Sequence, residues 1–141
     1  MSFAREMKLI LLSISVLLLV PISACAGNPP LFEAAIKGDA TTIKTLLENG
    51  ADVNARDNNG GTALMYAAGR GQEAAVQALL DKGADVNAKD TFGYTALSLA
   101  LTSQRGSTNI ALTLIAKGAD VNAKDKDYGM TPLILAAWKG H

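Results

Sequence analysis

Gly50-Ala51-Asp52-Val53-Asn54-Ala55 occurs three times in this chain, returning with every letter unchanged at residues 83–88 and 118–123. The first interval is 33 residues and the second is 35. A second phrase keeps step with it: Thr-Ala-Leu at residues 62–64 and 95–97 becomes Thr-Pro-Leu at residues 131–133. Self-similarity at a period of this length is the signature of repeat architectures. The chain is therefore expected to use one structural unit several times.

Residues 62–87 show what one unit contains. Thr62 is expected to cap a first helix, because its hydroxyl can accept hydrogen bonds from the free N–H groups of a helix start. Apolar residues follow at the i, i+3, i+4 spacing of one helical face, twice in succession. Gly71 and Gly83 are expected to end the two helices, where a left-handed residue is favoured. The two apolar faces are Leu64, Ala67 and Ala68, and then Val76, Leu79 and Leu80.

Neither helix of such a unit can bury its face alone, because each carries only about three apolar anchors. Neighbouring units must supply the rest of the core, so the units are expected to stack into a solenoid. The alanine pairs at residues 34–35, 67–68 and 136–137 suit close packing of the first helices. The polar, turn-rich stretch 85–93 predicts a hairpin-like loop between units.

These units resemble the ankyrin repeat. The family's Thr-Pro-Leu-His-x-Ala-Ala opening is similar to residues 62–68 and 131–137, and its Leu-Leu-x-x-Gly-Ala-Asp-Val-Asn ending to residues 46–54 and 79–87. The resemblance covers about residues 29–141 and implies an all-α ankyrin-repeat solenoid of helix-turn-helix units joined by hairpin loops. The family's Asp-x-x-Gly loop matches residues 57–60 and 90–93, and its His is replaced by Met65, Ser98 and Ile134.

The same register divides the chain into repeats at about 29–54, 55–87, 88–122 and an incomplete fourth at 123–141. The two extra residues of the third repeat are expected in its helix-to-helix turn, between Ala100 and Gly106. The fourth repeat is expected to lack its second helix, as though the chain were cut short at His141. Its exposed residues would then include parts of Leu133, Ile134 and Leu135.

Residues 1–24 predict a signal peptide, followed by a short tether at residues 25–28. Arg5 and Lys8 form a basic start, and Leu9 to Val20 is a run of 12 residues, apolar except for two serines. A span of the membrane needs roughly 20 apolar residues. The run is shorter, so a cleaved export signal is expected in place of a membrane anchor.

The end of this segment is compatible with two different mature proteins. Ile22-Ser23-Ala24-Cys25 resembles a bacterial lipobox, which implies a lipid on Cys25 as the first mature residue. The alternative is ordinary cleavage after Ala26, because residues 24–26 also have the small-x-small form. Both predict export: the protein would be periplasmic, anchored to the membrane by lipid at Cys25 or else soluble in the periplasm.

Composition argues against several classes of function. Lysine plus arginine and aspartate plus glutamate number 13 each, so the net charge does not indicate a nucleic-acid surface. The lone histidine is His141 and the lone cysteine is Cys25, which leaves neither a positioned histidine base nor a cysteine nucleophile in the repeats. We therefore expect no enzyme activity and no cofactor.

The recurring polar residues predict turns and no metal site. Asp52, Asp85 and Asp120 stand one to a repeat, so they are expected to make local hydrogen bonds at a turn. The asparagines two positions later are expected to act in the same local way. They are Asn54, Asn87 and Asn122.

The positions that vary between repeats predict a partner-binding surface. In ankyrin stacks the loop tips and first helices form the concave binding face, and exposed aromatic residues are typical interface anchors. The alternative is that some of these side chains only shield neighbouring loops. The predicted residues are Arg70, Phe92, Tyr94, Tyr128, Met130 and Trp138.

Three hypotheses of function follow. The leading one is a non-catalytic protein-protein interaction module of the bacterial cell envelope, whose partner is a protein and whose only link to a membrane is a lipid on Cys25. A narrower one is an accessory or immunity-type protein that caps one enzyme or toxin. The third is that the repeats are the binding part of a longer protein, truncated at His141, with a catalytic domain beyond it.

Overall fold

The computed structural model describes residues 30–105 and 107–140, and these residues form seven helices joined by turns and loops. Within those two ranges no residue is in a strand, so the predicted all-α class is confirmed. The predicted signal peptide (1–24), the tether (25–28) with Cys25, and His141 lie outside the described residues.

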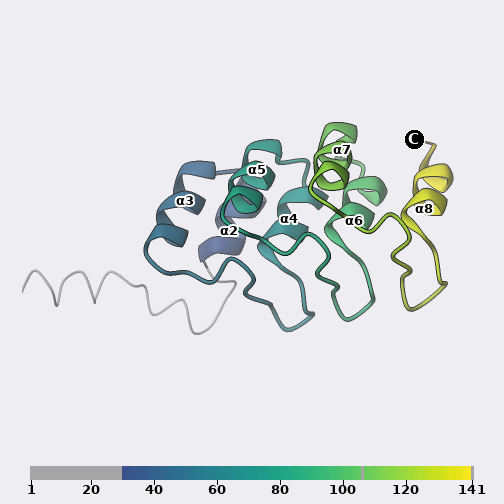
Figure 1. Cartoon of the computed structure of the whole chain (residues 1–141), viewed down its shortest axis with the longest axis horizontal. Coiled ribbons are helices and arrows are strands. Elements are labelled where there is room, and N and C mark those ends of the chain that lie inside the picture. Colours follow the sequence, from purple (N-terminus) through teal and green to yellow (C-terminus); the bar gives the residue numbers. More distant parts are fainter. Residues whose placement is uncertain (1–29, 106, 141) are drawn as a thin grey trace, which may run out of the picture.

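The helices form two layers that follow the length of a curved stack (Figure 1). Each inner helix packs against the inner helices next to it, and the outer helix of each unit packs on its own inner helix. The hairpin-like loops extend side by side from one face of the stack (Figure 1). The inner helices are α2 (Pro30–Lys37), α4 (Ala63–Gly69), α6 (Ala96–Thr102) and α8 (Pro132–Lys139). The outer helices are α3 (Ala40–Glu48), α5 (Glu73–Asp81) and α7 (Thr108–Ala116).

Threonine caps α4, α6 and α8, and the cap at Thr62 is the one predicted. The hydroxyl of Thr62 accepts the backbone N–H of Met65 at 3.4 Å, and Thr131 caps α8 in the same way. Thr95 forms a capping box: it accepts the N–H of Ser98 at 3.2 Å, while the Ser98 hydroxyl accepts the N–H of Thr95 at 3.4 Å. Ser98 occupies the position of the family's histidine, and its hydroxyl therefore forms a hydrogen bond at the start of α6.

The core runs between the two layers and contains the apolar faces predicted from the spacing. Ala67 and Ala68 are fully buried, so α4 can lie close to both neighbouring inner helices. Leu80 is half-buried at the edge of the core. The largest fully buried side chains are Phe32, Ile43, Leu64, Val76, Leu79, Leu97, Ile110 and Leu114.

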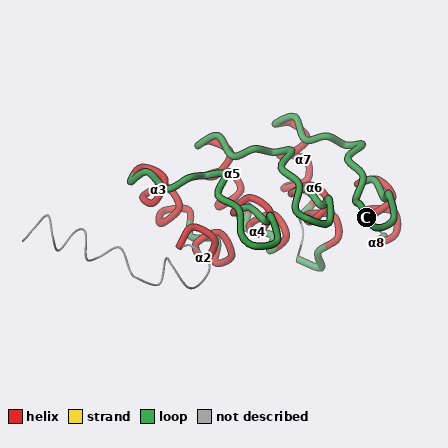
Figure 2. The backbone as a smooth tube through the Cα atoms, turned by 90° about the horizontal axis from the view of Figure 1, so that it is seen from below, coloured by secondary structure: helices red, strands yellow, loops and turns green. Residues whose placement is uncertain are grey.

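The turn between α4 and α5 depends on a glycine. Gly71 has a φ of +74°, and a Cβ at this position would lie 2.0 Å from the backbone oxygen of Arg105. Arg105 belongs to the longer turn of the third repeat, where the two-residue insertion was predicted, so successive turns are in close contact. Figure 2 shows the loops and turns following one another along the stack.

The aspartate and asparagine of the repeated phrase have different partners. Asp52 accepts the N–H of Asn54 at 2.9 Å, and the same local bond recurs at Asp85 and Asp120, as predicted. The prediction that the asparagines also act only locally is wrong. Asn54 accepts the N–H of Asp85 at 2.7 Å and Asn87 accepts that of Asp120 at 2.7 Å, so each amide ties its loop to the next repeat.

The exposure of α8 differs along the helix. Leu133 is 77% exposed and Ile134 is 50% exposed, as expected for a repeat with no outer helix among the described residues. The expectation that Leu135 is also uncovered is wrong, since this residue is only 4% exposed. Leu135 faces α6, where it lies beside Leu99 and Thr102.

Candidate binding surface

Two aspartates at the loop tips position the backbone of four predicted site residues. Asp90 accepts two backbone N–H groups through the same oxygen, both at 2.9 Å. Asp125 accepts two others at 2.8 and 3.4 Å. A carboxylate that accepts two N–H groups closes a tight turn and fixes what projects from it. The residues that donate are Phe92 and Tyr94 to Asp90, and Tyr128 and Met130 to Asp125.

Neighbouring loop tips are joined by backbone hydrogen bonds. Thr91 donates its N–H to the carbonyl oxygen of Asn59 at 2.9 Å, and Lys126 donates to that of Phe92 at 2.8 Å. Gly93 allows the second approach, because a Cβ at this position would lie 3.0 Å from the Lys126 nitrogen. The loop tips thus form a continuous edge with a fixed spacing.

Four predicted site residues meet in one cleft between the third and fourth repeats. This cleft, which we call the aromatic cleft, has a volume of about 290 Å³. The loop tips supply three of these predicted residues and α8 supplies Trp138. The cleft is lined by Tyr94, Leu99, Thr102, Tyr128, Met130, Leu135, Trp138 and Lys139.

The fifth predicted residue, Phe92, lines a second cleft one repeat earlier. That cleft has a volume of about 180 Å³ and lies between the loop tips of the second and third repeats. Leu99 lines both clefts, so the two are direct neighbours along the same face. The second cleft is lined by Asp57, Asn59, Gly61, Met65, Tyr66, Asp90, Phe92 and Leu99.

Arg70 is the predicted residue that the structure does not bring to these clefts. It is the exposed C-cap of α4 and lines neither cleft. A partner that touches Arg70 must therefore extend beyond the clefts along the turns. Its role in binding stays a prediction.

The aromatic side chains of the site differ in exposure. Tyr128 is 78% exposed, Trp138 73% and Phe92 49%, while Tyr94 is half-buried. The ammonium group of Lys139 lies 5.1 Å from the centre of the Trp138 ring, within cation–π range. Tyr128 and Trp138 consequently offer large apolar surfaces that packing within the chain leaves uncovered.

Negative charge gathers around the half-buried Tyr94. Burial raises the pKa of Tyr94, and the charges of Asp125, Asp127 and Asp90 raise it further. Asp125 itself is only 6% exposed, and its second carboxylate oxygen has no hydrogen-bond partner among the described residues. The loop-tip end of the aromatic cleft is thus polar and negative beneath its aromatic rim.

Tyr66 is a site residue that the sequence analysis missed. Its hydroxyl donates a hydrogen bond to Asp57, and its ring packs edge-on against Phe32 with centroids 5.5 Å apart. The hydrogen bond to Asp57 and burial raise the pKa of Tyr66 to about 12. Burial raises the pKa of Asp57, but hydrogen bonds from Tyr66 and two backbone N–H groups outweigh it and lower the pKa overall. The third and fourth repeats have Leu99 and Leu135 at this position, a substitution that could have pointed to Tyr66.

The side chains that line the two clefts are of the kinds found at recognition surfaces. In residues 30–105 and 107–140, no three His, Cys, Asp or Glu side chains converge as metal ligands would. None of the helices in this part of the chain combines the length and apolar character that crossing a membrane requires. The two clefts offer aromatic and apolar surface with a few polar groups at the rim, which is the composition of a recognition surface.

The comparisons with known proteins identify the family of the repeats. A family model described as ankyrin repeats, in three copies, matches residues 12–90 and 31–125. A stretch of 38 residues is 58% identical to E3 ubiquitin-protein ligase XBAT33 of Arabidopsis thaliana. That stretch is 27% of this chain and only 7% of the ligase, so it is similar to the ligase over a small part of its length. The chain belongs to the ankyrin-repeat family, whose stacks are typically protein-interaction modules.

Proposed function

We propose that this protein is a non-catalytic protein-interaction module of the cell envelope, and that its partner binds across the aromatic cleft and its neighbour. The observation that carries the proposal is the meeting of Tyr94, Tyr128, Met130 and Trp138 in one cleft. They come from two separate segments of the fourth repeat and from the loop of the third.

The exposure of the aromatic residues supports a binding role over a packing role. A ring that only shields a neighbouring loop would be largely covered by that loop, whereas Tyr128 and Trp138 are 78% and 73% exposed. Large aromatic side chains bury much apolar area at little cost in side-chain freedom, and they dominate measured hot spots. We therefore assign these two residues as the main anchors.

The rigidity of the loop tips adds to the expected affinity. Each tip is closed by an aspartate and bonded to the next tip through the backbone. Ordering flexible loops on binding reduces affinity, and a preorganised surface avoids much of that loss. The clefts can consequently bind a partner with small adjustments of side chains.

The envelope location rests on the sequence before the first helix. The basic residues Arg5 and Lys8, the apolar run 9–20 and the lipobox-like residues 22–25 support export and a lipid on Cys25. Labelled fatty acid should enter the wild-type protein and not the Cys25→Ser variant. Incorporation into neither, with a mature N-terminus at Gly27, would assign the soluble periplasmic product.

The binding proposal is tested with a Tyr128→Ala, Trp138→Ala double variant. Wild type and variant are used to capture partners from envelope extract, and the captured partner is then titrated against both. We expect a loss of affinity of at least ~30-fold, about 2 kcal/mol, with an unchanged melting temperature. Capture of a single enzyme whose activity falls on binding would assign the narrower accessory or immunity-type role.

The matched control is Asn58→Ala with Lys44→Ala. Both residues are exposed, Asn58 on the loop tip of the second repeat and Lys44 on an outer helix, and neither lines a cleft. This control should bind as the wild type does. If the aromatic variant binds equally well, the partner uses another surface and the proposal fails.

A further inference from the structure

Three aspartates lie at the two loop tips that border the aromatic cleft. Asp90 closes the tip of the third repeat and Asp125 that of the fourth, where Asp127 is exposed. A Cβ on Gly93, the residue before Tyr94, would lie 3.2 Å from the Cα of Asp125, so the two tips are in close contact. Burial raises the pKa of Tyr94, and the charges of these three carboxylates raise it further. The electrostatic potential at this end of the cleft is therefore negative.

One carboxylate oxygen of the fourth tip lacks a hydrogen bond that its counterpart in the second repeat has. There the Tyr66 hydroxyl donates to the Oδ2 atom of Asp57. Leu135 stands, like Tyr66, four residues after a capping threonine, and its side chain has no donor. The Oδ2 atom of Asp125 is accordingly buried with no hydrogen-bond partner among the described residues. A buried carboxylate is costly unless it is paired, so a positive charge nearby stabilises this one.

The same cleft contains aromatic rings, and one of them already has a cation over it. Tyr94, Tyr128 and Trp138 line the cleft. The ammonium group of Lys139 lies 5.1 Å from the centre of the Trp138 ring. The faces of aromatic rings attract ammonium and guanidinium groups, and tryptophan does so most strongly. Rings beside carboxylates favour a cation over a neutral group, because only a cation interacts with both.

The basic side chains nearby do not cancel the carboxylates. They are all exposed: Lys89, Lys124, Lys126 and Lys139. Water and salt screen exposed charges strongly, whereas a buried charge is screened much less. Asp125 is 6% exposed, so its charge acts inside the cleft while the lysines act mainly on the solvent.

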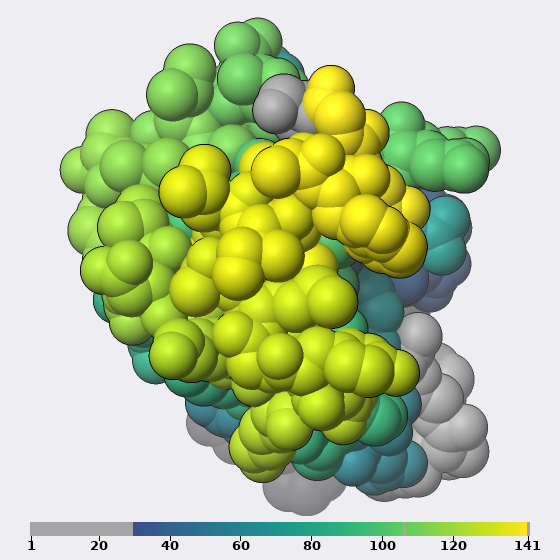
Figure 3. Space-filling view, turned by 90° about the vertical axis from the view of Figure 1, so that its right-hand side faces the viewer, coloured from purple at the N-terminus to yellow at the C-terminus, as the bar shows by residue number. Residues whose placement is uncertain are grey.

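The cleft belongs to a face that stays open along the stack. Figure 3 looks at the α8 end, with the loop of the fourth repeat in yellow-green and α8 in yellow. Phe92 corresponds to Tyr128 and remains 49% exposed although the fourth repeat follows it. Thr102 corresponds to Trp138 and is half-buried in the same situation. The cleft lies between two repeats that the structure describes, so its walls are complete without a further repeat.

We propose that the aromatic cleft receives a cationic side chain of the partner protein, a lysine ammonium or an arginine guanidinium, between its rings and the tip closed by Asp125. The proposal rests on the proposed function, because it names the group that the partner inserts into the same cleft. The rings contact the methylene groups and the charge of this side chain, and the aspartates supply the opposite charge. The volume of about 290 Å³ lies below the usual range for drug-sized ligands, which suits one side chain.

Short peptides test the preference for a cation without the partner. Trp138 is the only tryptophan of the chain, so its fluorescence in the full-length protein reports on the cleft. The probes are Gly-Arg-Gly, Gly-Lys-Gly and the neutral Gly-Gln-Gly, all with blocked ends. At least one cationic peptide should change the emission saturably and bind ~10-fold or more tightly than the neutral one. Added salt should weaken the cationic peptide alone. Equal binding of all three, or no saturable change with any, would overturn the proposal.

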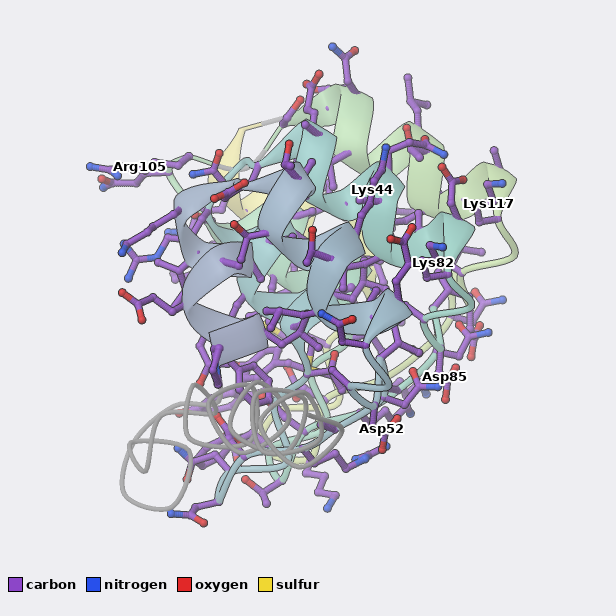
Figure 4. All side chains as sticks on the ribbon, turned by 90° about the vertical axis from the view of Figure 1, so that its left-hand side faces the viewer. Lys44, Asp52, Lys82, Asp85, Arg105 and Lys117 are labelled. Carbon is purple, nitrogen blue, oxygen red and sulfur yellow. The ribbon has the colours of Figure 1, made fainter. Side chains whose placement is uncertain are left out.

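The buried carboxylate is tested with Asp125→Asn. Asparagine keeps an oxygen that can accept the two backbone N–H groups of this tip, but it carries no charge. The affinity for the cationic peptide should fall at least ~5-fold. The matched control is Asp85→Asn, because Asp85 is also a loop aspartate that accepts a backbone N–H and it lines neither cleft. Figure 4 shows Asp85 on the same side of the stack as Lys82 and Lys117. This control should bind the peptide as the wild type does.

A second variant, Asp127→Asn, keeps the test decisive if circular dichroism shows that Asp125→Asn unfolds. Asp127 is exposed, and its side chain makes no hydrogen bond within the described residues. The affinity should fall ~2-fold, less than for the buried carboxylate because water screens this charge. Unchanged affinity in every folded charge variant would overturn the proposal.

The captured partner distinguishes this proposal from the proposed function. A partner that loses affinity for the Tyr128→Ala, Trp138→Ala variant, but none for the folded charge variants, would overturn the cationic side chain and leave the binding surface in place. A partner that ignores the aromatic variant, while the cleft still prefers the cationic peptides, would overturn the proposed function and with it the assignment of this group to the partner. Loss of affinity in both kinds of variant is the expected result.

Discussion

The side-chain oxygen of Asn54 accepts the backbone N–H of Asp85 at 2.7 Å, a bond between residues 31 positions apart. The bond is repeated between Asn87 and Asp120, and there the amide nitrogen of Asn87 also donates to the carbonyl of Gly118 at 3.0 Å. These asparagines are exposed, so they add little to the core. They fix instead the position of each loop on the next one.

Replacing the second of these amides should loosen the stack. Asn87→Ala removes two hydrogen bonds to the next repeat. A typical bond contributes roughly 0.5–1.5 kcal/mol, so the free energy of unfolding should fall by about 1–2 kcal/mol. Urea denaturation of the two proteins measures the difference.

The chain contains the matched control for this variant. Asn122 stands in the same six-residue phrase, but its side chain has no hydrogen bond to a further repeat among the described residues. Asn122→Ala should therefore change stability by less than ~0.5 kcal/mol. Equal losses of stability in the two variants would mean that the bonds from Asn87 to the next repeat do not stabilise the stack.

Two glycines with the same backbone conformation should tolerate alanine differently. Gly71 and Gly83 have φ values of +74° and +86°, but a Cβ meets the Arg105 oxygen at 2.0 Å in the first case and nothing within 4 Å in the second. Gly83→Ala should cost ~1–2 kcal/mol for the left-handed conformation alone. Gly71→Ala adds a clash with backbone and should cost ~1–3 kcal/mol more. Thermal melts of both variants check the order.

Adjacent leucines of α5 provide a test of the core. Leu79 is fully buried, so Leu79→Ala should lower the free energy of unfolding by ~2–5 kcal/mol. Leu80 is only half-buried, and Leu80→Ala should cost no more than about half as much because less apolar area is lost. Denaturant midpoints measure both. A larger loss at Leu80 would contradict the assignment of the buried face.

The bond between Tyr66 and Asp57 should make stability depend on pH in a defined direction. Tyr66→Phe removes the bond and should cost about 1 kcal/mol at neutral pH, a modest value because both side chains are partly in solvent. The pKa of Asp57 is lowered in the folded state, so its contribution is present above its ordinary pKa and lost as the pH falls through the lowered one. The pKa of Tyr66 is raised to about 12, so its contribution is present below its ordinary pKa of 10.0 and lost as the pH rises through about 12.

Urea titrations of wild type and Tyr66→Phe between about pH 2 and pH 7 test the acid side of this prediction. The difference between the two proteins should be constant near neutral pH and should shrink at the acid end. A difference that grows as the pH falls would contradict the assigned bond.

The parts of the structure that depend on local spacing could be predicted from the sequence. Thr62 as a cap, Gly71 after the first helix, and the buried faces around Leu64 and Leu79 follow from short-range rules of helix formation. The meeting of Tyr94 and Met130 could also be predicted, because each directly precedes the capping threonine of its repeat and a repeat register places equivalent positions side by side.

What the sequence did not reveal depends on contacts between non-equivalent positions. Asn54 and Asn87 look like ordinary turn residues in their local sequence. Their hydrogen bonds to the next repeat depend on where the next loop lies, which the local sequence does not show. Leu135 was expected to be uncovered because α8 has no outer helix among the described residues, but the helix directs this side chain toward α6. Tyr66 was missed because its partner Asp57 belongs to the preceding loop.

The hydrogen bonds between loop tips give two interfaces, between repeats two and three and between repeats three and four, a reporter each. The amides of Thr91 and Lys126 are each bonded to the preceding tip and to nothing within their own loop. Their exchange with deuterated water therefore measures how often one repeat separates from its neighbour, independently of whether its own helices have opened. If the stack frays from the α8 end, the amide of Lys126 exchanges before that of Thr91, and a ligand in the aromatic cleft slows the first much more than the second.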